Sequence, residues 1–135
     1  MQYAIEHWGL AARDTGALKD WYVAVLGAEA VWNNGAIPTA WFVRLPGGPV
    51  LEIYPAARSV ADTTDNGVAG WRHLALRVAD LPAAVAILTA RGVVFNEPVK
   101  PAGGGGRVRF FTDPEGNLLH LVERPADAIL TPLLP

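Results

Sequence analysis

Hydrophobic residues at helical spacing mark two segments of the chain. Between residues 15 and 27 they recur three or four positions apart, at Leu18, Trp21, Tyr22, Val25 and Leu26. The segment 81–92 repeats the pattern with Leu81, Ala84, Val85 and Leu88. This period predicts two helices with one apolar face each. Asp14 and Asp80 are the predicted N-caps, and Gly27 and Gly92 the predicted C-terminal stops.

Short runs of β-branched and aromatic residues between Gly, Pro and Asn predict strands. One strand precedes each helix, within residues 7–14 and 73–80. Three more follow each helix, at 30–34, 39–46 and 49–55 in the first half and at 93–98, 106–114 and 118–125 in the second. Each half is therefore predicted to fold as a strand, a helix and three strands.

The two halves also repeat one another in sequence. HWGLAARD (7–14) aligns without gaps with HLALRVAD (73–80), and LEIYP (51–55) resembles LHLVERP (119–125). One small sheet cannot cover its own apolar face, whereas two copies related by a pseudo-twofold axis can close around a shared cleft. Equivalent positions then face each other across that cleft. This singles out His7 and His73 in the first strands, and Glu52 and His120 in the last.

The repeat sets the expected domain organisation. One domain spans residues 1–135, with module one at about 1–57 and module two at 71–125. A polar, Asp/Thr-rich linker covers 58–70. The tail, 126–135, is rich in Pro and apolar residues, and we expect it to pack on the body or on a partner chain.

Charge and composition exclude several classes of protein. The net charge is −2, which does not favour a nucleic-acid or anionic-membrane partner. The absence of cysteine excludes a disulfide scaffold, a thiol nucleophile and a thiolate metal site. No basic segment followed by an apolar one opens the chain, and no apolar run reaches membrane-spanning length. We expect a cytoplasmic protein.

A closing phrase, DPEGNLLHL (113–121), carries a resemblance to a known family. Together with the tandem modules, it resembles the vicinal oxygen chelate superfamily over about residues 3 to 125. The superfamily includes glyoxalase I, methylmalonyl-CoA epimerase, extradiol dioxygenases, fosfomycin-resistance enzymes and bleomycin-binding proteins. The resemblance implies an α+β fold in which two tandem βαβββ modules form a curved mixed sheet around a shared cleft. It also implies a homodimer.

The resemblance further implies a metal site. In the metal-dependent members the ligands come from the first and last strands of each module, which places them here at His7, Glu52, His73 and His120. Imidazole and carboxylate suit Fe, Mn, Ni, Co or Zn without choosing among them. Glyoxalase I, the extradiol dioxygenases and the fosfomycin enzymes carry glutamate where this chain has His120. The single carboxylate of this set is Glu52.

Three functions follow from the resemblance. The first is a metal-dependent lyase or isomerase in which Glu52 is both ligand and base for a small substrate that chelates the metal through oxygens. The second is an Fe(II)-dependent extradiol-type dioxygenase. The third is a metal-free drug-binding resistance protein.

Strand parity adds weaker candidates. His73, Ala75 and Arg77 share one face of their strand, so Arg77 is a candidate for binding an anionic substrate group, or else for a salt bridge at the rim. Arg109 is a second substrate-binding candidate, or part of a solvated face. Gly103–Gly106 form either a lid or a hairpin connection. Five aromatic residues are expected mostly in the core, with one or two lining the pocket: Trp8, Trp41, Phe42, Tyr54 and Phe111.

Overall fold

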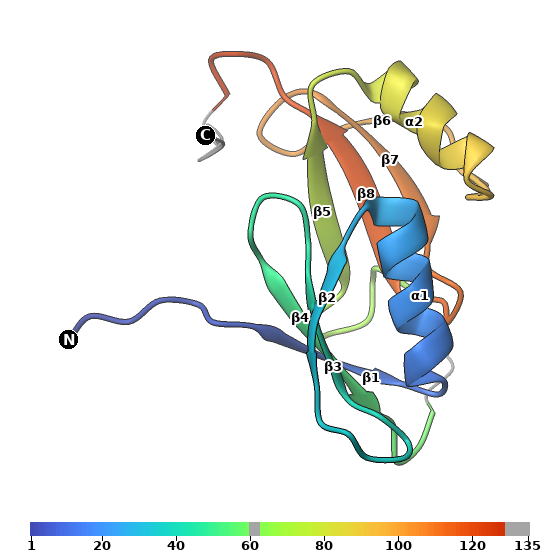
Figure 1. Ribbon diagram of the computed structural model, residues 1–135. Coiled ribbons are helices and arrows are strands. Elements are labelled where there is room, and N and C mark those ends of the chain that lie inside the picture. The colour runs from blue at the N-terminus through green and yellow to red at the C-terminus, as the bar shows by residue number, and fades with distance from the viewer. Residues whose placement is uncertain (60–62, 129–135) are drawn as a thin grey trace. The chain divides into compact units, whose positions relative to one another are not determined.

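The computed structural model describes residues 1–59 and 63–128 and consists of two successive βαβββ modules (Figure 1). Module one contains β1 (Trp8–Ala12), α1 (Thr15–Leu26), β2 (Glu29–Asn33), β3 (Trp41–Arg44) and β4 (Val50–Pro55). Module two contains β5 (His73–Val78), α2 (Leu81–Ala90), β6 (Lys100–Pro101), β7 (Arg107–Thr112) and β8 (Leu118–Glu123). The chain divides into two compact units between residues 60 and 61, one for each module. The predicted α+β class and the doubled order of elements are confirmed.

Each module forms its own four-stranded mixed sheet, in the order β1-β4-β3-β2 or β5-β8-β7-β6. The first strand runs parallel to the last, and the remaining pairs are antiparallel. Strand β2 contains a bulge, because Ala30 lies opposite Val43 and Trp32 opposite Phe42, which leaves Val31 as an extra residue. Apart from that bulge, the two sheets follow the same plan.

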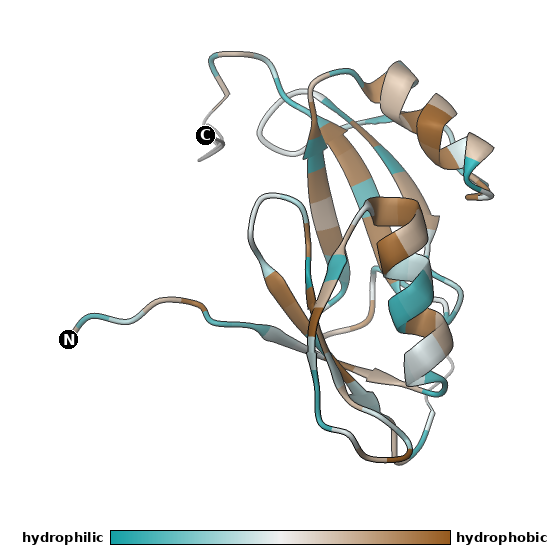
Figure 2. Cartoon of the chain, in the orientation of Figure 1, coloured by the Kyte–Doolittle hydropathy of each residue, from teal (hydrophilic) through white to brown (hydrophobic). Residues whose placement is uncertain are grey.

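The apolar face of each helix lies in the core of its own module. Helix α1 contacts β3 and β4 and buries Thr15, Leu18, Tyr22 and Val25. Helix α2 contacts β8 and buries Leu81 and Leu88. Burying a large aliphatic or aromatic side chain stabilises a fold by about 1.5–3 kcal/mol, so these few contacts hold each helix on its sheet. Figure 2 shows the hydrophobic colouring concentrated on α2 and on β8.

Both predicted N-caps are confirmed. Asp14 accepts a hydrogen bond from the Ala17 N–H at 2.9 Å, and Asp80 accepts one from the Ala83 N–H at 2.8 Å. Gly27 ends α1 in the left-handed conformation, with φ of +71°. Helix α2 ends differently, because Arg91 is its C-cap and Gly92, with φ of +92°, follows one residue later.

Glu123 adds a second tie at the start of α2. Its carboxylate accepts the Leu81 N–H at 2.6 Å and also lies 2.8 Å from Arg107 Nη2. The hydrogen bond from the Leu81 backbone, followed by the Arg107 guanidinium, lowers the pKa of Glu123. The equivalent position in module one is Pro55, so α1 has no such tie to the last strand.

The strand predicted at 93–98 is wrong. The described chain has no strand there, and β6 comprises only Lys100 and Pro101. Pro98 and Pro101 lack the N–H that a ladder requires, which explains why pairing in this segment is so short. The strand predicted at 106–114 is shorter than expected because Asp113 turns the chain: its carboxylate accepts the N–H groups of Glu115 and Asn117 at 2.9 and 3.0 Å.

The four-glycine run forms a hairpin connection between β6 and β7. The Ala102 N–H donates to Gly106 O at 3.0 Å, and Arg124 Nη1 donates to the carbonyls of Gly103 and Gly105. A Cβ at Gly106 would lie 2.0 Å from Glu123 O, so only glycine fits at that position. The hairpin alternative therefore describes this segment.

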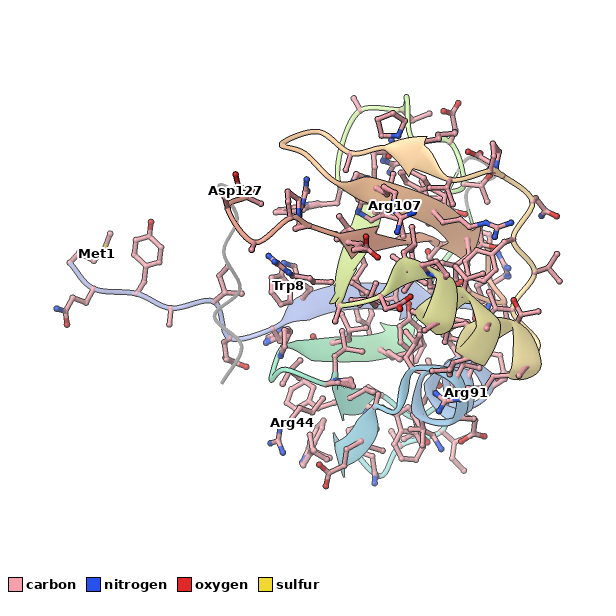
Figure 3. The ribbon with its side chains drawn as sticks, turned by 90° about the horizontal axis from the view of Figure 1, so that it is seen from above. Met1, Trp8, Arg44, Arg91, Arg107 and Asp127 are labelled. Atoms are coloured by element: carbon pink, nitrogen blue, oxygen red, sulfur yellow. The ribbon has the colours of Figure 1, made fainter. Side chains whose placement is uncertain are left out.

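The N-terminal end of the chain adds little to the core of its module. Residues 1–7 run out from β1 as an extended segment, with Met1 at its far end (Figure 3). Most of the predicted tail, 129–135, lies outside the described residues, as do 60–62 of the predicted linker. None of the helices in the described ranges is both long and apolar enough to cross a bilayer.

Candidate metal-ligand pairs

The register of the two sheets places the four candidate ligands in equivalent positions. Gly9 lies opposite Glu52 in the parallel pair of module one, and Ala75 lies opposite His120 in that of module two. His7 and His73 each stand two residues before these strand positions. Because residues two apart on a strand share a face, each histidine lies on the same face as the candidate from the last strand. Each module therefore carries one pair.

The pair of module one is polar and partly exposed. His7 Nε2 lies 3.3 Å from Glu52 Oε2, and His7 Nδ1 lies 2.7 Å from Glu6 Oε1. The two side chains of the pair are 32% and 34% exposed. The hydrogen bond with Glu6 is the main cause that raises the pKa of His7, and the negative charges of Glu6 and Glu52 raise it further against the opposing effect of burial.

The pair of module two is packed edge to face. The ring centroids of His73 and His120 lie 4.7 Å apart at an interplanar angle of 70°. His73 Nδ1 also lies 2.8 Å from Asn66 Oδ1. His120 is only 7% exposed, and neither of its ring nitrogens has a hydrogen-bond partner among the described residues. Burial, and then the charges of His73 and Arg124, lower the pKa of His120 to about 4.

These properties of His120 fit a metal ligand. A buried polar atom without a partner is costly, and native structures contain few of them. Its low pKa keeps the imidazole neutral at neutral pH, with the lone pair that a metal requires. Within the described part of either unit, no group of three His, Asp or Glu side chains is close enough to hold an ion. Each module by itself therefore offers two ligands.

A phenylalanine accompanies each pair. Phe42 lies opposite Glu52, and Phe110 lies opposite His120, on the neighbouring strand. The Phe42 ring lies 5.6 Å from that of His7, and the Phe110 ring is stacked on His120 at 4.8 Å and 25°. Phe110 is not among the residues predicted from the sequence. The repeat contained the signal, since WFVRLP (41–46) aligns with RFFTDP (109–114) and keeps Phe and Pro four residues apart.

The aromatic residues expected in the core are mostly not buried. Only Phe111 is buried, Trp8, Trp41 and Phe42 are half-buried, and Tyr54 is 39% exposed. The bulge in β2 brings Trp32 opposite Phe42, with ring centroids 4.8 Å apart. Tyr54 lies over Gly9, where a Cβ would meet its ring at 3.1 Å. Trp32, Phe42 and Tyr54 thus lie on the face that bears Glu52, and they give module one an aromatic, partly exposed face beside its pair.

The two candidate arginines are placed differently. Arg77 is half-buried and lies on the face of β5 that carries His73. Arg109 lies opposite Leu121, on the other face of β7 from Phe110. Its Nε donates to Glu97 O at 3.1 Å, and its guanidinium lies 5.0 Å from the Phe95 ring. The structure therefore brings Arg77, but not Arg109, to the face that carries the histidine pair.

Comparison with known proteins gives one consistent picture. The model of the Glyoxalase/Bleomycin resistance protein/Dioxygenase superfamily matches residues 4–121. A glyoxalase family protein from Enterococcus faecalis is 29% identical, with a TM-score of 0.75 over 89% of this chain and 97% of that one. A superfamily member from Sphaerobacter thermophilus DSM 20745 is 28% identical, with a TM-score of 0.69 over 90% and 98%.

A third structure is similar to this chain in its fold alone. The fosfomycin resistance protein FosX from Listeria monocytogenes, solved with Mn(II) and sulfate, is 18% identical, with a TM-score of 0.68 over 93% of each chain. No curated protein matches the sequence.

Proposed function

Because the chain belongs to the Glyoxalase/Bleomycin resistance protein/Dioxygenase superfamily, we propose that it is a metal-dependent lyase or isomerase. Its substrate is a small molecule that chelates the metal through oxygens. His7, Glu52, His73 and His120 are the proposed ligands of one divalent ion. The observation that carries this proposal is His120, a buried and neutral imidazole without a hydrogen-bond partner among the described residues.

The donor set supports a transition metal. Three imidazoles and one carboxylate suit Fe, Mn, Ni, Co or Zn, whereas Mg and Ca prefer sites made mostly of oxygen ligands. The FosX structure, of the same fold, contains Mn(II), which agrees with this class of ion. The equivalent register of Glu52 and His120 also supports a single shared function for the two pairs.

The residues of the chain then have distinct roles in the proposed reaction. The bound metal would act as a Lewis acid that stabilises negative charge on substrate oxygens. Glu52, as the only carboxylate of the set, takes a proton from the substrate carbon next to the chelating oxygens and returns it to the product. His7, hydrogen-bonded to Glu6, is oriented toward that carboxylate. Arg77, on the His73 face, binds an anionic group of the substrate.

Metal content tests the proposal directly. Protein purified without an affinity tag is assayed by elemental analysis for the wild type, His120→Ala and a control, Val122→Ala. Val122 lies two residues further along the same strand and is also buried, so the control separates ligand loss from damage to β8. We expect near-stoichiometric metal in the wild type and the control, and its loss in His120→Ala.

Other outcomes would change the assignment. A wild type without metal, even after reconstitution, would overturn the proposal and favour a drug-binding protein. Iron as the bound metal, with oxygen uptake on a catechol, would replace the lyase or isomerase with a dioxygenase.

A further inference from the structure

The two imidazoles of module two are oriented by different means. His73 has a hydrogen bond with the side chain of Asn66. His120 has none within the described residues, although its side chain is buried. A histidine that binds a metal ordinarily donates its other ring N–H to a carboxylate, a carbonyl or water, and this bond fixes the ring. Something else must fix the ring of His120.

Phe110 is placed to do so. Its ring lies 4.8 Å from the His120 ring and only 25° from parallel. The centroid of the same ring lies 5.8 Å from that of His73, with the two rings nearly perpendicular at 86°. Phe110 and His120 are also direct partners in the antiparallel ladder of β7 and β8, so the backbone sets their spacing. Rotation of the imidazole about its Cβ–Cγ bond would break this stack, and a stacked aromatic pair is favourable beyond its buried area.

We propose that Phe110 is the positioning residue for His120, and that an aromatic stack replaces the usual hydrogen bond to a ligand histidine. Its value for metal binding rests on the proposed function. The orientation of the ring itself can be tested on the metal-free protein.

Module one provides an internal control. Phe42 occupies the equivalent position and contacts His7, but His7 is also hydrogen-bonded to Glu6. Loss of the Phe42 ring should therefore increase the mobility of the His7 ring less than loss of the Phe110 ring increases that of the His120 ring. Phe111 provides a second control, because it is the next residue on β7, points to the opposite face and is buried beside Phe95.

The first measurement is the mobility of the His120 ring in metal-free protein, from NMR relaxation of its Cε1–H group. Phe110→Leu is expected to increase this mobility, and Phe110→Tyr to keep the wild-type value. Phe110 is only half-buried, so the leucine variant should fold. Phe111→Leu should lower Tm without freeing the His120 ring. An immobile His120 ring in folded Phe110→Leu would overturn the proposal.

The second measurement is the affinity for Co(II), followed by its visible absorption. We expect Phe110→Leu to bind Co(II) about 2- to 10-fold more weakly, which is the fold-change that corresponds to the loss of one aromatic stack. Phe110→Tyr should restore the affinity, and Phe42→Leu should have the smaller effect. Unchanged affinity in Phe110→Leu would contradict the positioning role. A wild type that binds no Co(II) would count against the proposed function, while the ring mobility still decides the inference about Phe110.

Discussion

The two modules share one frame but place their last-strand candidate ligands, Glu52 and His120, in different environments. In module one, His7 and Glu52 are each about one-third exposed and lie within 3.3 Å of one another. In module two, His120 is buried, has no hydrogen-bond partner in the described residues, and is stacked against aromatic rings. Charge is therefore accommodated in the partly exposed pair of module one and disfavoured at His120.

Glu52 and His120 therefore differ in the chemistry that their surroundings allow. A carboxylate that remains partly solvated can exchange protons with substrate and water, whereas a buried neutral imidazole is suited to donating a lone pair. In the proposed function, this shared register position holds the base in one module and a ligand in the other. Variants that exchange or remove these properties can test the comparison.

The largest expected effect comes from removing the charge of the first pair. Glu52→Gln keeps an oxygen that can face the metal but loses the base, and removal of a general base typically costs about 10² to 10⁴-fold in rate. We expect turnover of a chelating substrate to fall by this order while metal content persists. Full activity with metal still bound would show that Glu52 is not the base.

The next effect concerns the neutral imidazole of the second pair. The pKa of His120 falls from 6.5 in the unfolded chain to about 4 in the fold. Below pH 6.5 the unfolded state therefore binds more protons than the folded state, and stability is lost as the pH falls from 6.5 toward 4. The shift corresponds to about 3 kcal/mol for this buried group.

Urea unfolding of metal-free protein at pH 7 and pH 4 measures this contribution. The wild type should lose about 3 kcal/mol more than His120→Gln between these two values, since the variant has no imidazole to protonate. Equal losses in the two proteins would mean that His120 titrates normally.

The pKa of His7 shifts in the opposite direction, because the hydrogen bond with Glu6 raises it. In an NMR titration toward low pH, His7 should therefore gain its proton before His120 does.

The smallest effect concerns how each helix begins. Asp14→Ala should destabilise the protein by about 1 kcal/mol, the usual cost of losing an N-cap. Asp80→Ala should cost less, because Glu123 still accepts the Leu81 N–H at the start of α2. Denaturant unfolding of both variants, and of Asp80→Ala combined with Glu123→Gln, tests this ranking. A larger cost for Asp80→Ala alone would refute the supporting role of Glu123.

Local chemistry made part of this structure predictable from the sequence. Helix starts follow from side chains that bond the nearest backbone, which makes the caps Asp14 and Asp80 predictable from the sequence. The repeat with His7 and His73 also placed equivalent residues correctly, because strand parity fixes which side chains share a face. The joint role of the four residues in binding metal stays a prediction.

What the sequence did not reveal depends on contacts between strands. Phe110 lies within a run of apolar residues, and its role appears only when the ladder sets it opposite His120. Strand β6 is limited to Lys100–Pro101 because the prolines remove N–H groups that a strand ladder needs. The β-propensities of the residues do not express this loss. The lack of a hydrogen-bond partner for His120 likewise depends on the folded surroundings.

The bulge at Val31 has a consequence for the behaviour of the protein at high concentration. Strand β2 stands at the end of its sheet, and all five of its residues are exposed. A regular strand of this kind is a template on which other chains can add and aggregate. One extra residue interrupts the ladder and increases the local twist, which makes the edge a poor template. The residue that turns Trp32 toward Phe42 therefore also makes this edge a poor site for strand addition by another chain.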